Sequence, residues 1–179
     1  MLNRKLERST FSTSPLPAHP SALIHSHIYG ELPLANAVIH THSPHSLVFA
    51  CHGRTIQPFT LQSQTLGEVP CFDSDVDAVK ERHRTLLDAQ KESITSGVSG
   101  YRYAQKHFES IPQQITKVLS SRKHELKRHG LAFTVYKHGV FVCARNMSEA
   151  FDNLIRVERN AQVQLLSSNL KQKADELSS

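Results

Sequence analysis

The run from residue 37 to residue 42 constrains the fold of this chain more than any other feature, because it places two β-branched residues directly before two histidines. Val38 and Ile39 favour a short buried strand after the turn-forming Leu-Pro-Leu-Ala-Asn stretch. Side chains two positions apart on a strand point to the same face. His40 and His42 therefore present two imidazoles in the same direction.

A third histidine lies in a second β-rich run near the other end of the chain. His138 stands between Tyr136 and the apolar residues 140 to 142, so a neighbouring strand can deliver its imidazole to the first two. Three neutral nitrogens on rigid strands, with a fourth position open, are typical of a catalytic zinc site. Hydrogen-bonded strand histidines are the alternative, because a His-x-His pair arises about once by chance at this histidine content. The chain has a second such pair, His25 and His27.

The surrounding sequence resembles the class II aldolase and adducin family, which includes fuculose-phosphate aldolase, ribulose-phosphate epimerase and methylthioribulose-phosphate dehydratase. The resemblance to the first family signature lies in residues 20 to 25, 28 to 29 and 36 to 43. Residues 138 to 142 and 147 to 151 resemble the second, a histidine-glycine strand followed by a helix that opens with a Glu-Ala pair.

The resemblance covers residues 20 to 72 and 131 to 168 and implies a set of metal ligands. It implies zinc held by His40, His42 and His138, with each nitrogen about 2.0 to 2.1 Å from the ion. His25 and His45 match family positions that do not touch the metal, so they are expected to pack or to support the ligands.

The length and composition of the chain predict a single α+β domain. A chain of 179 residues with 39% hydrophobic residues can bury one core, and it has no apolar run of about 18 residues that would span a membrane. The resemblance implies an α/β/α layered domain around a mostly antiparallel sheet, class II aldolase-like. We expect a flexible basic tail at 1–19, the domain at 20–168 and a polar C-terminal tail at 169–179.

The hydrophobic patterns predict the order of the elements. A helix begins at Ser21, and the last helix, from Ser148, carries apolar residues at i, i+3 and i+4 spacing. That spacing predicts a buried face made of Phe151, Leu154, Ile155, Ala161 and Leu165. Between the two helices, the patterns predict strands at 37–42, 56–61 and 69–72, a helix or a strand at 46–51, and helices at 73–93 and 112–129.

The three cysteines favour a reducing compartment, and the cytoplasm is the expected location. Cys51, Cys71 and Cys143 are odd in number and widely spaced, with no C-x-x-C pair. Cys143 lies five residues after His138 and would face the opposite side of a regular strand, so it is expected to pack rather than to bind metal. The basic N-terminus is faintly similar to a transit peptide, but Glu7 argues against that interpretation.

The net charge of +5 is concentrated in the N-terminal segment and in residues 122 to 129. A basic cluster near a metal site could attract a phosphorylated sugar, although cations in the last turn of a helix also complement its dipole without a ligand. Nucleic-acid binding is not expected, because no aromatic residues are interleaved with the cluster and no known motif surrounds it.

Two departures from the family limit how much of the family's function can be expected of this chain. Aldolases and epimerases of the family have an acid at the position of Ser21, and the dehydratases have one near Ser63. His27 and Glu68 are the weak candidates for the missing proton carrier. The family's strand pair and phosphate-binding hydroxyl residues have no counterpart before residue 20, so the resemblance implies a domain truncated at its N-terminal edge.

Two functions of different classes follow. One is a zinc-dependent lyase or isomerase, aldolase- or epimerase-like, acting in carbohydrate metabolism on a small hydroxy-carbonyl or sugar-phosphate substrate. The other is a catalytically silent, adducin-like module for binding or assembly. The resemblance also implies self-association, in rings of four with active sites between subunits.

Overall fold

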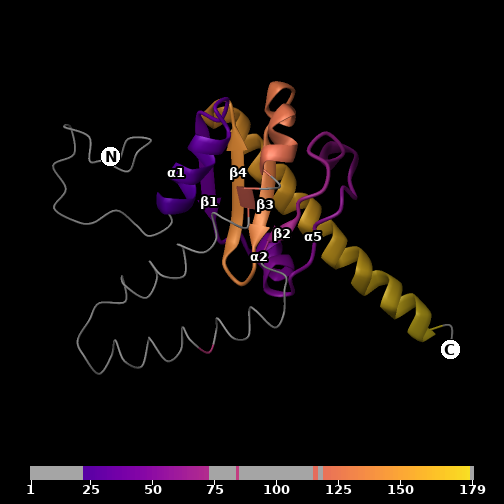
Figure 1. Ribbon diagram of the computed structural model, residues 1–179. Helices are drawn as coiled ribbons and strands as arrows, with labels where there is room; N and C mark the ends of the chain where they lie inside the picture. Colours follow the sequence, from indigo (N-terminus) through magenta and orange to yellow (C-terminus); the bar gives the residue numbers. More distant parts are fainter. Residues whose placement is uncertain (1–21, 73–83, 85–114, 117–118, 178–179) are drawn as a thin grey trace. The chain divides into compact units, whose positions relative to one another are not determined.

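The structure is a computed structural model that describes residues 22 to 72, 84, 115 to 116 and 119 to 177 (Figure 1). Three sequence predictions lie outside these residues: the tail at 1–19, Ser21 as the helix cap and, apart from Arg84, the helix at 73–93. The chain divides into two compact units, Met1–Pro33 with Asp75–Lys123 and Leu34–Ser74 with His124–Ser179. Each unit is described by itself, and the predicted domain boundaries stay a prediction.

The first unit contains helix α1, Ala22–Glu31. Its buried stripe is Ile24 and Ile28, with Leu32 one turn further, and all three are fully buried. This spacing of four residues is the signature of a helix that packs along one side. Nε2 of His27 lies 2.6 Å from Oγ1 of Thr116, so the unit also contains a polar contact between distant parts of the sequence.

The predicted helix at 112–129 is confirmed for its described residues before Lys123, and the chain from Lys123 to His129 differs from it. Residues 115, 116 and 119 to 122 are helical, and they lead into the 3-10 helix η2, Lys123–Lys127. Leu119 and Leu126 are buried, as an amphipathic helix requires.

The second unit is built on a four-stranded sheet with the order β1-β4-β3-β2. Strands β1 (Ala37–Thr41), β4 (Gly139–Ala144) and β3 (Leu131–Val135) are antiparallel neighbours. Strand β2, Cys71–Phe72, joins the edge of β3 in parallel. The predicted α+β class and mostly antiparallel sheet are therefore confirmed.

Two helices cover one face of this sheet. Helix α2, Pro44–Cys51, follows β1 after a short turn, and helix α5, Met147–Leu177, follows β4 and runs across the sheet and beyond it (Figure 1). The segment at 46–51 is thus a helix, and Pro44 fits its first turn because that position needs no amide hydrogen. The core between sheet and helices contains Ile56, Leu66, Val69, Ala132, Val140, Val142, Val157 and Ala161.

The strand predicted at 56–61 is wrong. Only Ile56 pairs with another segment, in an isolated bridge to Val69, and the 3-10 helix η1 follows at Leu61–Ser63. Pro58 explains the difference, because a proline has no amide hydrogen to donate to a neighbouring strand.

The buried face predicted for the last helix is partly wrong. Phe151 and Ile155 are exposed, and the face turned toward the rest of the domain is made of Ala150, Asn153, Leu154, Val157, Asn160 and Ala161. The helix carries apolar residues on two faces, and periodicity alone cannot say which of the two is covered. Within the described residues, no helix is both long and apolar enough to cross a membrane.

Candidate metal centre

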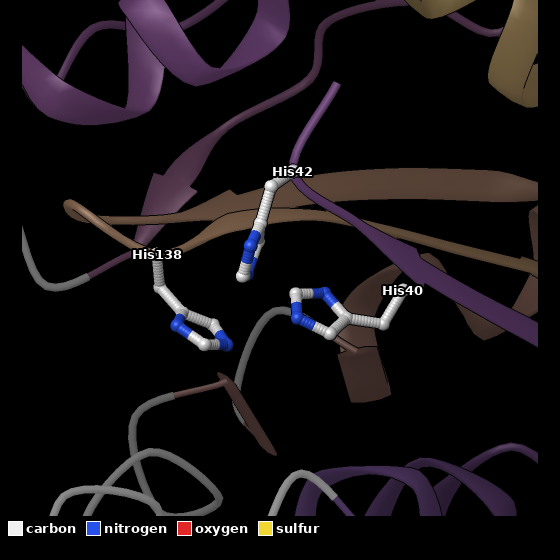
Figure 2. A group of neighbouring side chains, drawn as sticks. All are labelled: His40, His42 and His138. Atoms are coloured by element: carbon white, nitrogen blue, oxygen red, sulfur yellow. The ribbon is translucent and has the colours of Figure 1, made fainter. Parts of the chain in front are cut away.

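The structure brings the three histidines predicted from the sequence together at one end of the sheet (Figure 2). His40 belongs to β1, His42 follows the last residue of that strand, and His138 precedes the first residue of β4. In the register of the sheet Thr41 pairs with Val140, so the end of β1 meets the beginning of β4. The antiparallel pairing of these two strands therefore creates the site.

His138 lies in a turn, and the prediction that placed it within a strand is wrong. Its backbone nitrogen donates a hydrogen bond to the carbonyl of Val135 at 2.9 Å, which closes the hairpin between β3 and β4. Lys137, within this turn, has a φ of 54°, the left-handed conformation that such reversals often need. The pairing of β3 with β4 fixes both ends of the turn that carries the third imidazole.

The three rings are close enough to share one ion. The ring centroids of His40 and His138 are 4.6 Å apart, and His42 lies 5.0 Å from each of them. One nitrogen from each ring lies within 4.8 Å of the other two. Bonds of about 2.0 to 2.1 Å let one ion bridge nitrogens up to about 4 Å apart, so a small rotation of the side chains would suffice.

The environment of His40 sets which of its nitrogens can bind a metal. Nδ1 lies 3.1 Å from the carbonyl oxygen of Val140, which can only accept, so Nδ1 donates the hydrogen and Nε2 keeps the lone pair. The ring also stacks on Phe141 with a centroid separation of 4.1 Å. This is the arrangement expected of a metal-binding histidine, whose second nitrogen donates to a fixed acceptor.

Gly139 supplies the space into which the rings fit. A Cβ atom at this position would lie 2.6 Å from the carbonyl oxygen of Thr41, 2.7 Å from Cδ2 of His42 and 3.1 Å from Cε1 of His40. The two shorter contacts are closer than real side chains come to their neighbours, and the φ of 155° also favours glycine. The close approach of the histidines to the backbone thus explains the Lys-His-Gly sequence, and the residues fit a metal ion.

The other predicted participants lie elsewhere or beyond the described residues. Among the residues that the structure describes, no other group of three histidine, cysteine or acidic side chains could hold a metal. Ser21 is outside the described residues, and His27 contacts Thr116 within the first unit. Glu68 is exposed in the segment between η1 and β2.

The predicted orientation of Cys143 needs a correction. It is buried and takes no part in the histidine group, but it lies on the same side of β4 as Phe141, two residues away, and thus on the side of His40. The expectation of opposite faces assumed that His138 belonged to the strand.

Sequence reasoning missed Glu158, which anchors the segment that follows His42. Its carboxylate accepts hydrogen bonds from the backbone nitrogens of His45 and Ser46, at 2.8 and 3.0 Å, and from Nδ1 of His45 at 2.8 Å. Burial raises the pKa of Glu158, but the hydrogen bonds from His45 and Ser46 outweigh it, so the pKa lies below its ordinary value. His45, which was expected to pack or to support the ligands, has Glu158 as its hydrogen-bond partner.

The fold and the site together describe a small α+β domain whose three-histidine group could hold a metal ion. The chain belongs to the family described as the Class II Aldolase and Adducin N-terminal domain, whose model matches residues 3–165. The family predicted from the two signatures is therefore confirmed. The match begins at residue 3, whereas the sequence patterns predict that the domain begins at residue 20.

Solved structures share the fold at low sequence identity. The L-fuculose-1-phosphate aldolase of Thermus thermophilus superposes with a TM-score of 0.57 at 19% identity, covering 97% of this chain and 74% of that one. Another L-fuculose 1-phosphate aldolase gives 0.57 at 16% identity, covering 94% and 61%. YgbL of Escherichia coli, an aldolase/epimerase/decarboxylase candidate, gives 0.55 at 20% identity, covering 92% and 63%. The chain thus spans less than two thirds of two of these three proteins, and no curated protein matched it.

Proposed function

We propose that this protein is a zinc-dependent, aldolase- or epimerase-like lyase, with His40, His42 and His138 as the metal ligands. The observation that carries the proposal is the convergence of three imidazoles whose nitrogens lie within 4.8 Å of one another. Three neutral nitrogen ligands leave at least one position open for a substrate oxygen or for water, as in catalytic zinc sites. A structural zinc site would instead use four protein ligands.

A bound zinc would supply Lewis acidity toward a carbonyl or enediolate oxygen of a small hydroxy-carbonyl compound. The chain's own residues hold the ligands in place: Val140 fixes the ring of His40, the hairpin turn fixes His138, and Gly139 leaves room for the rings. A phosphorylated sugar is the proposed substrate class, which the names of the two fuculose-phosphate aldolases with this fold support.

The proposed reaction also requires a proton carrier. Carbon–carbon cleavage next to a carbonyl needs a group that moves a proton, and such a group typically contributes about a hundredfold to ten-thousandfold in rate. Serine occupies the family's acid position at residue 21. We therefore propose His27 and Glu68 as the positions to test, together with a water molecule bound to the metal.

The second candidate function is a catalytically silent, adducin-like binding or assembly module. The serine at position 21 favours it, because retained metal ligands without a proton carrier would bind an ion and turn nothing over. We propose self-association for either function, in the form of the tetramer that the family resemblance implies. The free cysteines among the described residues support a reducing location such as the cytoplasm.

Zinc content and turnover, measured on the same preparation, test the two functions. We expect about one zinc per chain in the wild type, loss of zinc in His138→Ala, and retention in the control His52→Ala, an exposed histidine whose ring lies 2.8 Å from the carbonyl oxygen of Val48 in its own helix. Turnover is then assayed for aldolase, epimerase and dehydratase reactions on phosphorylated and unphosphorylated sugars. Full zinc content in His138→Ala would refute the ligand assignment, whereas stoichiometric zinc without any turnover would favour the silent module.

A further inference from the structure

Helix α5 has a second row of apolar residues that the described part of the chain leaves partly or largely exposed. Its exposed apolar residues are Met147, Phe151, Ile155, Val163, Leu166 and Leu170, with exposed fractions of 62, 56, 36, 37, 57 and 70%. At 100° per residue these positions centre about 180° away from the residues that pack on the sheet. We call these six residues the outer stripe, and it extends about 35 Å along the helix.

The outer stripe has the character of a contact surface. Single exposed apolar side chains are common, but a continuous row of them on one helix face marks an interaction site or an aggregation risk. Two charged residues lie beside the row near its midpoint: Asp152 and Arg159 are both exposed and lie to one side of Ile155. Neither has an ion-pair or hydrogen-bond partner among the residues that the structure describes.

The two charges lie on the same flank of the stripe because seven residues make about two helical turns. A hollow of about 420 Å³ opens along this flank, between α5 and the η1 segment. It is lined by Gln62, Thr65, Asp152, Ile155, Arg156 and Arg159. The flank therefore offers both a carboxylate and a guanidinium, together with space for side chains of another molecule.

From this arrangement we infer that the outer stripe binds a second copy of the same chain, with the two α5 helices antiparallel around a two-fold axis beside Ile155. A two-fold axis brings residue i of one copy to residue j of the other and j to i. Asp152 of each copy then faces Arg159 of the other, which forms two equivalent ion pairs from residues that have no such partner within the described part of one chain. A surface made for an unrelated protein would not need to complement itself.

The same register pairs four of the six residues of the outer stripe, whereas Leu166 and Leu170 extend past the beginning of α5 in the other copy. Phe151 and Ile155 of both copies lie at the centre, and Met147 of one copy lies beside Val163 of the other. Desolvated aromatic and aliphatic side chains at the centre with charges at the rim are the usual anatomy of a stable protein contact. The contact involves none of the three histidines, so it holds whether or not the proposed lyase activity is correct.

Reciprocal charge changes test this contact on the full chain by analytical ultracentrifugation. We expect the wild type to associate at micromolar concentration and Asp152→Arg or Arg159→Asp to weaken self-association at least tenfold. A mixture of the two variants should associate again, because each then carries the charges that the other needs. The control Lys127→Asp makes the same charge change as Arg159→Asp at an exposed position elsewhere and should associate like the wild type.

Restored association in the mixture also proves that both variants are folded. A wild type that stays monomeric at about 100 µM would overturn the inference. So would single variants that associate normally, or a mixture that stays dissociated while each variant keeps the circular dichroism spectrum of the wild type.

Discussion

Glu158 and His45 are 113 residues apart in the sequence, yet one oxygen of the Glu158 carboxylate accepts two hydrogen bonds from His45, both 2.8 Å long. The other oxygen accepts from the backbone nitrogen of Ser46. The first turn of α2 has amide hydrogens without a helical acceptor, and Ser43 at its cap position makes no side-chain capping bond. Glu158 therefore caps α2 from a different helix and fixes the chain three residues after His42.

Replacement of this carboxylate should weaken both the fold and the metal site. Glu158→Gln removes the charge and places an amide group against backbone donors, so we expect a loss of about 1.5 to 3 kcal/mol in unfolding free energy. Zinc affinity should fall about tenfold or more because the segment carrying His42 loses its anchor. Urea unfolding and chelator competition measure the two effects. Glu149→Gln, on the same helix but paired with Arg145, should leave zinc affinity unchanged.

The Glu158 contact should also make stability depend on acid pH. Because its pKa is below the ordinary value of 4.5 in the folded chain, the folded state favours the carboxylate. The stabilisation is complete above the unfolded pKa and is lost as the pH falls through the folded pKa. The difference in unfolding free energy between wild type and Glu158→Gln should therefore be constant from pH 7 to about pH 5 and shrink below about 4.5. A difference that stays constant or grows as the pH falls well below 4.5 would contradict this prediction.

Gly139→Ala should disturb the histidine group from its backbone side. The added methyl would meet Thr41 and His42, so we expect a destabilisation of about 1 to 3 kcal/mol and a clear loss of zinc affinity. Gly67→Ala is the matched control, since its φ is also positive, at 70°, but no atom lies within 4 Å of the new Cβ. The control should lose some stability and keep its zinc affinity. Equal zinc affinity in both variants would show that the rings do not need the space at Gly139.

Ser21→Glu tests whether the missing family acid limits turnover. If the resemblance aligns this position correctly, the restored carboxylate should raise kcat/KM for retro-aldol cleavage by up to about a hundredfold to ten-thousandfold. Ser21→Gln controls for side-chain size without a charge. Wild-type turnover that is vigorous and indifferent to residue 21, but falls in His27→Ala or Glu68→Gln, would move the proton transfer to one of those residues.

Much of the three-histidine group could be predicted because its signals are local. The β-branched residues before His40 and His42 define a strand, and the period of a strand then fixes their common face. The third histidine was predicted from a second β-rich run and from the resemblance, but its conformation was not, because the apolar residues near His138 conceal a hairpin turn. Lys137 gives no sign of its left-handed conformation in the sequence.

The remaining features depend on contacts that a sequence pattern does not contain. Glu158 is one of several charged residues on an amphipathic helix, and only the packing of α5 against α2 brings it to His45. Likewise, Phe151 and Ile155 have the spacing of a buried stripe, yet the opposite face of α5 carries the small residues Ala150 and Ala161, which let the helix approach the sheet closely.

The pairing of β1 with β4 has a consequence for the order of events in folding. His40 and Val140 are 100 positions apart, so bringing these strands together closes a very long loop, at an entropic cost on the order of 4 kcal/mol. Such a long-range contact forms late and only together with the rest of the sheet. Of the three histidines, only His40 and His42 are close together in the unfolded chain. Metal affinity that depends on all three histidines would therefore be acquired only at the last step of folding. An ion held there would act as a reversible cross-link between segments about a hundred residues apart.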